Sequence, residues 1–286
     1  MSLSAEQIAA HPDILAAIRR QSVAMNGAYD GNPRLSAVFA TQQRWLMAHL
    51  GVSLHFRRDP SVPRHCLTVT RFVDEVKRHR IASVNTADAF AKEMIKYGII
   101  EQLPSGSDRR VRELVPSREG LDALTGWLSL HLDTLDGLDG GTRVSAFAAE
   151  PESLARIQPL VADGLLTLDA VRVPAKTFSL FTWLDKGGVV MDRMIAGMGE
   201  IVPGAARVPT SVMSVYEMAE WLQLSRTHLS RKLHEAEALG SIGWEGRRFH
   251  STMWVSAGFL REMVMAQAVK LAVIDAAFEA AFGGTD

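Results

Sequence analysis

The sequence predicts a mainly α-helical protein with two small β-hairpins, in which one arrangement of two helices and a hairpin occurs twice. Three observations support this fold class. Residues 218–242 have the pattern of a helix, a tight turn and a second helix that ends at a glycine. A basic hairpin pattern follows that helix pair, and residues 83–100 match the second helix without a gap at a constant offset of 142 residues.

The second helix of residues 218–242 has one apolar face and one basic face. Leu229, Leu233 and Ala236 repeat at i, i+4 and i+7, so they pack against the preceding helix. Ser225 stands where an N-cap is needed, because its hydroxyl can accept a backbone N–H. The outward positions carry cations and hydrogen-bond donors: Arg226, Thr227, His228, Ser230, Arg231 and Lys232. This face predicts a helix that enters the major groove of DNA, and a core hairpin with a solvated basic face is the alternative.

A hairpin follows this helix, because the hydrophobic period changes after Gly240. Residues 241–243 predict one strand, residues 245–248 a turn and residues 249–255 a returning strand. Helix, turn, helix and hairpin together make a winged helix. Arg247 and Arg248 at the hairpin tip are expected to contact the phosphate backbone or an adjacent minor groove.

The earlier segment 83–100 indicates a weak internal duplication of this unit. The matched positions are Ser83 with Ser225, Ala87 with Leu229, Ala91 with Leu233, Met94 with Ala236, and Gly98 with Gly240. The outward residues differ from those of the later copy, and the expected DNA contacts here are Ser83, Asn85, Thr86 and Lys92. Asp88 does not fit this pattern, since a carboxylate in the groove must meet a cytosine amine or stay away from phosphates.

A hairpin is predicted here too, with Arg109, Arg110 and Arg112 beside its tip. Residues 97–121 resemble the wing of MarR-type winged-helix transcription regulators, through Asp108-Arg109-Arg110 and the helix start at residues 117–120. The resemblance covers roughly residues 34–135. It implies that the wing arginines contact DNA and that helices at both ends of the domain build a dimer. The later copy lacks the Asp-Arg-Arg wing, and two reading units in one chain depart from the single unit typical of the family.

The rest of the chain is expected to form supporting helices. The predicted segments are an N-terminal helical extension (1–33), a MarR-like winged-helix domain (34–136), a helical linker or scaffold (137–207) and a second winged-helix domain with a C-terminal helix (208–286). Helices are expected at 6–20, 34–58 and 67–80, after Pro151 and after Pro174, with a linker at 137–141.

Composition narrows the function classes. With 47% hydrophobic and 22% charged residues in 286, the chain is expected to be globular. The lone Cys66 excludes an intramolecular disulfide and a cysteine-cluster metal site, and together with the absence of a secretory signal it predicts a cytoplasmic protein. Charges interrupt the apolar segment 258–282, which predicts a buried or dimerising helix rather than a membrane span. No catalytic motif is found, so we expect no enzyme activity, no metal and no cofactor.

Positive charge gathers locally although the net charge is −1. Residues 64–118 contain eleven Lys and Arg against seven Asp and Glu, whereas residues 121–200 contain six against eleven. A local basic face on a neutral protein favours a specific DNA-binding protein, although chance unevenness is an alternative. The sequence therefore predicts a transcriptional regulator that binds double-stranded DNA through two recognition helices and two basic wings.

Other partners and functions stay open at this point. A second copy of the chain and a small-molecule effector of unknown identity are both compatible with the resemblance, and no membrane partner is expected. A replication initiator of the tandem winged-helix type and a protein-interaction adaptor are the competing functions. The residues expected to contact DNA are Ser83, Asn85, Thr86, Lys92, Arg109, Arg110, Arg112, Ser225, Arg226, Thr227, His228, Arg231, Lys232, Arg247 and Arg248.

Overall fold

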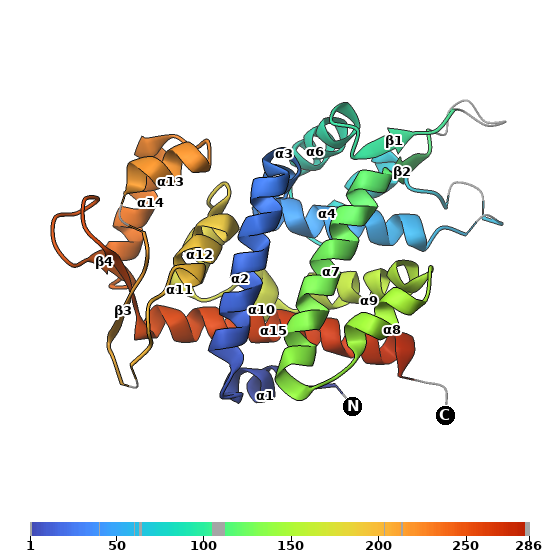
Figure 1. Ribbon diagram of the computed structural model, residues 1–286. Coiled ribbons are helices and arrows are strands. Elements are labelled where there is room, and N and C mark those ends of the chain that lie inside the picture. Colours follow the sequence, from blue (N-terminus) through green and yellow to red (C-terminus); the bar gives the residue numbers. More distant parts are fainter. Residues whose placement is uncertain are drawn as a thin grey trace. The chain divides into compact units, whose positions relative to one another are not determined.

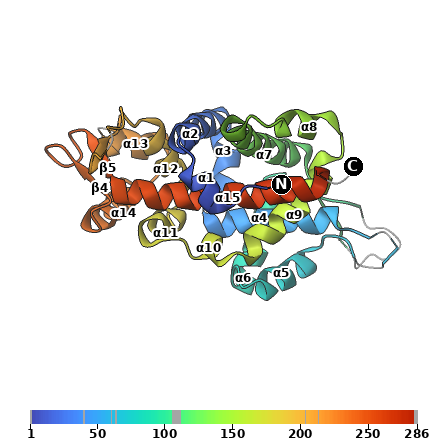
Figure 2. The ribbon, with the colours of Figure 1, turned by 90° about the horizontal axis from the view of Figure 1, so that it is seen from below.

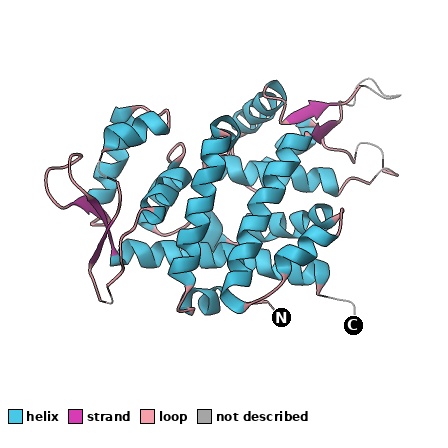
Figure 3. Cartoon of the chain, in the orientation of Figure 1, coloured by secondary structure: helices cyan, strands magenta, loops and turns pink. Residues whose placement is uncertain are grey.

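The structure is a computed structural model that describes residues 2–39, 41–59, 61–62, 65–104, 112–202, 204–212 and 214–283. It is mainly helical with two small antiparallel sheets, which confirms the expected fold class at this level (Figures 1 and 3). The chain divides into two compact units. Unit 1 comprises Met1–Leu3, Gln43–Leu168 and Leu271–Asp286, and unit 2 comprises Ser4–Gln42 and Asp169–Lys270.

Unit 1 contains six helices, two strands and the end of a seventh helix among its described residues. The helices are α4 (Gln42–Phe56), α5 (Val69–Arg78), α6 (Val84–Lys96), α7 (Arg118–Asp139), α8 (Arg143–Ala149), α9 (Ser153–Thr167) and the last part of α15 (Ala257–Phe282). The strands β1 (Ile100–Gln102) and β2 (Leu114–Pro116) pair in antiparallel fashion, with Ile100 opposite Pro116.

Unit 2 contains the remaining elements and the first part of α15. Its helices are α1 (Ala5–Ala10), α2 (Ile14–Gly31), α3 (Pro33–Val38), α10 (Asp169–Arg172), α11 (Lys176–Thr182), α12 (Gly187–Ala196), α13 (Val215–Trp221) and α14 (Arg226–Ala238). Its three strands β3 (Arg207–Pro209), β4 (Ile242–Trp244) and β5 (Met253–Ser256) form a sheet in which β5 is central.

Several elements differ from the expected ones. The helix expected at 6–20 is split, because Pro12 disfavours helical backbone at His11, which takes extended angles after α1. The helix expected at 34–58 is also two helices, α3 and α4. The linker expected at 137–141 is wrong for residues 137–139, which continue α7 until Gly140 ends it at φ 71°. Strand β3 was not expected, since three residues are too few to show an alternating pattern.

Each unit contains one copy of the same helix pair. We call α5, α6, β1 and β2 the first module, and α13, α14, β4 and β5 the second module. In each module the first helix ends in a left-handed residue, Arg80 or Gln223, both at φ 53°. The N–H of the next residue then donates back to the first helix, from Leu224 to the Ala219 oxygen at 2.9 Å in the second module and from the matching position at 3.0 Å in the first.

The second helices of the two modules end alike as well. Gly98 and Gly240 both have φ 70°, a backbone conformation that a side chain disfavours. After Gly240, the N–H of Ser241 donates to the Ala236 oxygen at 3.0 Å, and an equal bond follows Gly98. These bonds confirm the internal duplication at the backbone level, with the offset of 142 residues expected for this helix.

The duplication continues through the hairpins. Ser117 and Ser256 each donate a backbone N–H to the residue before the first strand, at 2.9 and 2.8 Å. Their hydroxyls then accept from the third residue of the following helix segment, at 3.3 and 3.1 Å. The matched start of the helix is therefore a serine, not the glycines at 120 and 258. Each module consequently comprises two helices, a hairpin and the start of a third helix.

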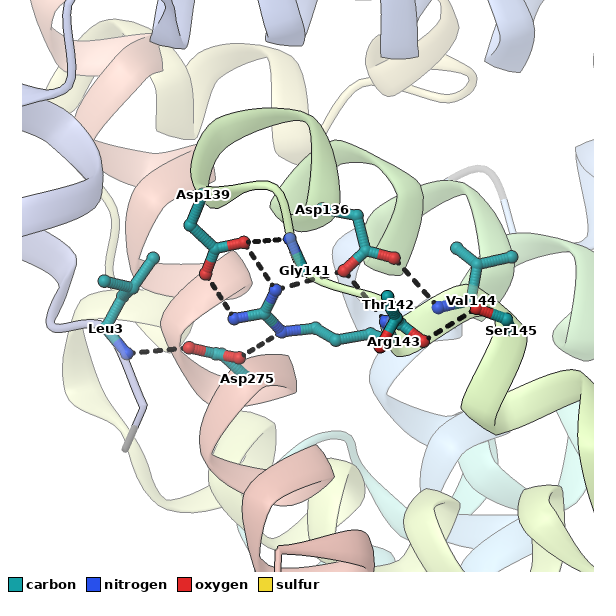
Figure 4. A network of polar contacts seen from close by, with 9 residues as sticks. All are labelled: Leu3, Asp136, Asp139, Gly141, Thr142, Arg143, Val144, Ser145 and Asp275. Carbon is teal, nitrogen blue, oxygen red and sulfur yellow. Dashed lines mark hydrogen bonds and ion pairs between the residues drawn. The ribbon is translucent and has the colours of Figure 1, made fainter.

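A buried arginine organises the end of α7 in unit 1 (Figure 4). The Arg143 guanidinium reaches Asp139 at 2.6 Å, Asp136 at 3.1 Å and Asp275 of α15 at 2.7 Å. The other Asp275 oxygen accepts the backbone N–H of Leu3 at 2.7 Å. Hydrogen bonding to Arg143 lowers the pKa of Asp139 below its usual value. One cation therefore joins α7, α8, α15 and the N-terminal segment.

We predict that Arg143→Ala destabilises unit 1 by about 3–5 kcal/mol, because it leaves buried Asp275 without its counter-ion. Arg118→Ala is the control, since its pair with Asp122 is exposed and is expected to contribute less than about 1 kcal/mol. Urea denaturation of the three proteins measures the difference. Equal losses for the two variants would contradict this account of the Arg143 cluster.

A second polar contact lies between α2, α12 and α15 in unit 2. The Ser22 hydroxyl donates to Asp192 at 2.7 Å. Burial raises the pKa of Asp192 to about 6, against the lowering effects of this bond and of Lys270. Burial likewise lowers the pKa of Lys270 to about 8, against the attraction of Asp192. Both charged forms are therefore less favourable in the folded protein than in the unfolded chain.

This pair predicts a pH dependence of stability. Folded Asp192 keeps its proton up to about pH 6 whereas the unfolded value is 3.8, so its contribution falls as pH rises between these values. Folded Lys270 loses its proton near pH 8 rather than 10.5, so its contribution recovers as pH rises through that window. Asp192→Asn should remove the fall between pH 4 and 6, measured by urea denaturation in that range. An unchanged slope would show that Asp192 titrates normally.

Candidate nucleic-acid interface

Helix α14 of the second module buries one face and exposes the other. Leu229, Leu233 and Ala236 are fully buried, as the i, i+4, i+7 spacing predicted. The helix lies beside α13 and the strands of its sheet (Figure 2). At its C-terminal end, Ser241 hydrogen-bonds the Thr177 hydroxyl of α11 at 2.8 Å, and both side chains are buried. The opposite face is therefore held in a fixed orientation toward solvent.

The two N-cap serines behave differently. Ser83 caps α6, because its hydroxyl accepts the Thr86 N–H at 3.2 Å. Ser225 occupies the N-cap position of α14 with extended backbone angles, but its hydroxyl makes no capping hydrogen bond. The expectation that the Ser225 hydroxyl caps the helix is therefore wrong, although the position is right. Ser225 and Thr227 are both exposed at this end of α14.

The cations of α14 have unequal surroundings. Arg226 is exposed, and its guanidinium lies 5.0 Å from the centre of the Tyr216 ring of α13. Arg231 lies 3.3 Å from the His228 ring nitrogen and 4.0 Å from a carboxylate one turn later. Lys232 is half-buried and donates to the same carboxylate at 2.8 Å. Only part of the expected basic face is thus free of intramolecular partners.

The charge order along α14 is the reverse of the one that stabilises a helix. Arg226 lies in the first turn, where the helix dipole is positive, and Glu235 and Glu237 lie in the last turn, where it is negative. Each such contact costs about 0.3–1 kcal/mol at an exposed site. The hydrogen bond from Lys232 lowers the pKa of Glu235, which keeps that carboxylate ionised. The helix therefore concentrates positive potential at its N-terminal half.

The tip of the second hairpin is partly folded back. Arg248 pairs with Glu237 at the end of α14, and its guanidinium lies 5.9 Å from the centre of the Phe249 ring. Phe249 has φ 64° and contacts Trp244 edge-on at 4.9 Å, so residues 249–252 form a turn and the returning strand starts only at Met253. Arg247 is exposed at this tip.

In the first module the expected contact residues are exposed but weakly charged. Ser83, Asn85 and Thr86 lie at the exposed start of α6. Lys92 is exposed and pairs with Asp88 at 2.7 Å, which explains how that carboxylate is accommodated. Arg112 is exposed, whereas Arg109 and Arg110 lie outside the described residues, as does Asp108 of the resemblance.

Sequence reasoning missed Tyr216. It is 53% exposed on α13, and its ring supports the Arg226 side chain. An aromatic residue that helical spacing leaves outside the apolar stripe was the available signal.

Comparison with family models, curated proteins and solved structures finds no match to this chain. Within the described residues, no group of three or more His, Cys, Asp or Glu side chains could hold a metal ion. The same search range contains no helix with the length and apolar character that a membrane crossing requires.

The two serines provide a direct test of the local geometry. Ser83→Ala should cost about 1 kcal/mol of stability, because an N-cap bond is lost. Ser225→Ala should change stability by less than about 0.5 kcal/mol, since no such bond exists. Urea denaturation compares the two variants with the wild type. A larger loss for Ser225→Ala would mean that its hydroxyl does cap α14.

Proposed function

We propose that this protein is a transcriptional regulator that binds double-stranded DNA sequence-specifically, with each module acting as a winged helix. In this proposal α6 and α14 enter the major groove and the hairpins contact phosphates. The observation that carries the proposal is the exposed N-terminal half of α14, where cations are placed against the preference of the helix's own dipole. Such a placement costs stability, which an anionic ligand at that end would offset.

The size and direction of α14 support this use. A helix of 13 residues is about 20 Å long, and the major groove is about 12 Å wide, so the exposed first turns can enter it. The hydrophobic face is fully occupied by the rest of unit 2, which leaves the polar face for a ligand. Recognition helices of this kind contact base edges through their N-terminal residues.

The local electrostatics support a phosphate partner. The chain has a net charge of −1, so a general attraction to DNA is weak and binding depends on local cations. Arg226 and Arg231 of α14 and Arg247 of the hairpin are exposed. Each phosphate contact that such a residue makes contributes about 0.9 to the slope of log K against log salt.

Selection of bound sequences from randomised duplex DNA at two salt concentrations tests the proposal. The wild type should enrich a defined motif, and Arg226→Ala with Arg231→Ala should weaken binding by reducing the salt slope by about one per lost phosphate contact. Arg20→Ala with Arg261→Ala is the charge-matched control, since both arginines are exposed in unit 2 away from α14.

The outcomes separate the competing functions. Enrichment of one motif that the control variant still binds, and the α14 variant does not, supports the regulator. Enrichment of tandem copies of one short repeat would favour a replication initiator. No enrichment at either salt concentration would contradict DNA recognition and favour a protein-interaction adaptor.

A further inference from the structure

We propose that the stacked pair of Arg226 and Tyr216 recognises a guanine, and that the first module recognises an A·T pair, so that the DNA target is asymmetric. This inference rests on the proposed function and makes it specific. It assigns the guanine contact to Arg226, and to Tyr216 the role of a positioning residue that holds the guanidinium in place.

Arg226 is the cation of α14 that the fold leaves available. Its guanidinium lies 5.0 Å from the centre of the Tyr216 ring. In the part of the chain that the structure describes, it makes no ion pair, whereas Arg231 and Lys232 of the same helix both approach Glu235. Stacking uses the flat face of the guanidinium and leaves its N–H groups in the plane free to donate.

The chemistry of this pair fits guanine. A guanidinium donates two parallel hydrogen bonds, and guanine presents two acceptors, O6 and N7, in the major groove. Arg226 is the first residue of α14, the end of the helix that contacts base edges in this type of recognition. Tyr216 is 53% exposed, and its ring restricts the arginine to fewer rotamers, so less conformational entropy is lost on binding.

The first module lacks this pair although its backbone is the same. Counted back from the left-handed residue that ends each first helix, Tyr216 corresponds to Val73, and buried Val215 corresponds to buried Phe72. Counted from the N-cap serines, Arg226 corresponds to Val84. Two valines thus replace the arginine and the tyrosine.

The residues that start α6 suit a different base pair. Val84 is 47% exposed, and an apolar side chain at this position can contact the thymine methyl group. Asn85, which follows it, is exposed and can make paired hydrogen bonds with adenine N6 and N7. The modules therefore present a guanine-directed and an A·T-directed helix, which predicts two unlike half-sites.

The closing experiment starts from the motif selected by the wild type. Affinity is measured for that duplex and for duplexes in which each guanine is replaced in turn, with wild type, Arg226→Lys, Tyr216→Phe and Tyr216→Leu. For the wild type, one guanine replacement should weaken binding by roughly 5- to 150-fold, the range of a good paired contact. Arg226→Lys keeps the charge, so it should lose most of that preference while the salt slope stays unchanged.

The tyrosine variants test positioning. Tyr216→Phe keeps the ring and should retain the guanine preference, whereas Tyr216→Leu should reduce it with little change in salt slope. Transfer of the pair to the first module, as Val73→Tyr with Val84→Arg, should add a guanine preference to the other half-site. Thermal unfolding of each variant confirms that it is folded.

The failures are distinguishable. If the wild type selects no motif at all, the proposed function fails and the guanine assignment falls with it. If it selects a motif that binds Arg226→Lys with unchanged guanine preference, or a palindrome of two identical half-sites, only the present inference is overturned.

Discussion

One backbone constraint determines what each module can present to a partner. Between its two helices stands a residue in the left-handed conformation, Arg80 or Gln223, although neither is glycine. That conformation costs about 1–2 kcal/mol for such a residue, and the hydrogen bonds back to the first helix offset the cost. Since the turn sets the angle of the second helix, it decides which side of α6 or α14 is buried. The exposed polar face depends on this geometry.

Charges are used in opposite ways in the two units. In unit 1, Arg143 is almost fully buried and holds three aspartates, so its charge is consumed by the fold. In unit 2, Arg226 is exposed on an aromatic ring and pairs with no carboxylate among the described residues. Removal of a buried partner acts on stability, whereas removal of an exposed one acts on recognition. The location of a cation, more than its number in the chain, therefore separates structural from functional roles.

The sequence predicted those features that local chemistry determines. The apolar stripe through Leu229 and Leu233 and the terminal Gly98 and Gly240 are where spacing placed them, because helical period and backbone freedom are local properties. The class of mainly helical protein with small hairpins is likewise confirmed. The expected segments with boundaries at 33, 136 and 207 differ from the two units, because each unit is assembled from parts far apart in the chain. Periodicity carries no information about such assembly.

The candidate site was only partly predictable for a related reason. Exposure of Arg226, Arg231 and Arg247 followed from the helical and hairpin patterns. Whether a cation is available depends on its neighbours in space: Glu237 pairs with Arg248 from eleven residues away, and the Tyr216 ring reaches Arg226 from a different helix. The hydroxyl of Ser225 illustrates the same limit, since position alone could not show whether it caps the helix.

The comparison of the two modules within one chain adds a final step. They agree at the positions that the backbone requires: the N-cap serines, the buried stripe and the glycine that ends each second helix. They differ at the outward positions, where Val84 stands in place of Arg226 and Asn85 in place of Thr227. A duplicated framework with identical surfaces would suit a symmetric ligand. The same framework with unlike surfaces suits a ligand whose two parts differ, and in duplex DNA such a difference also fixes the direction in which the chain binds.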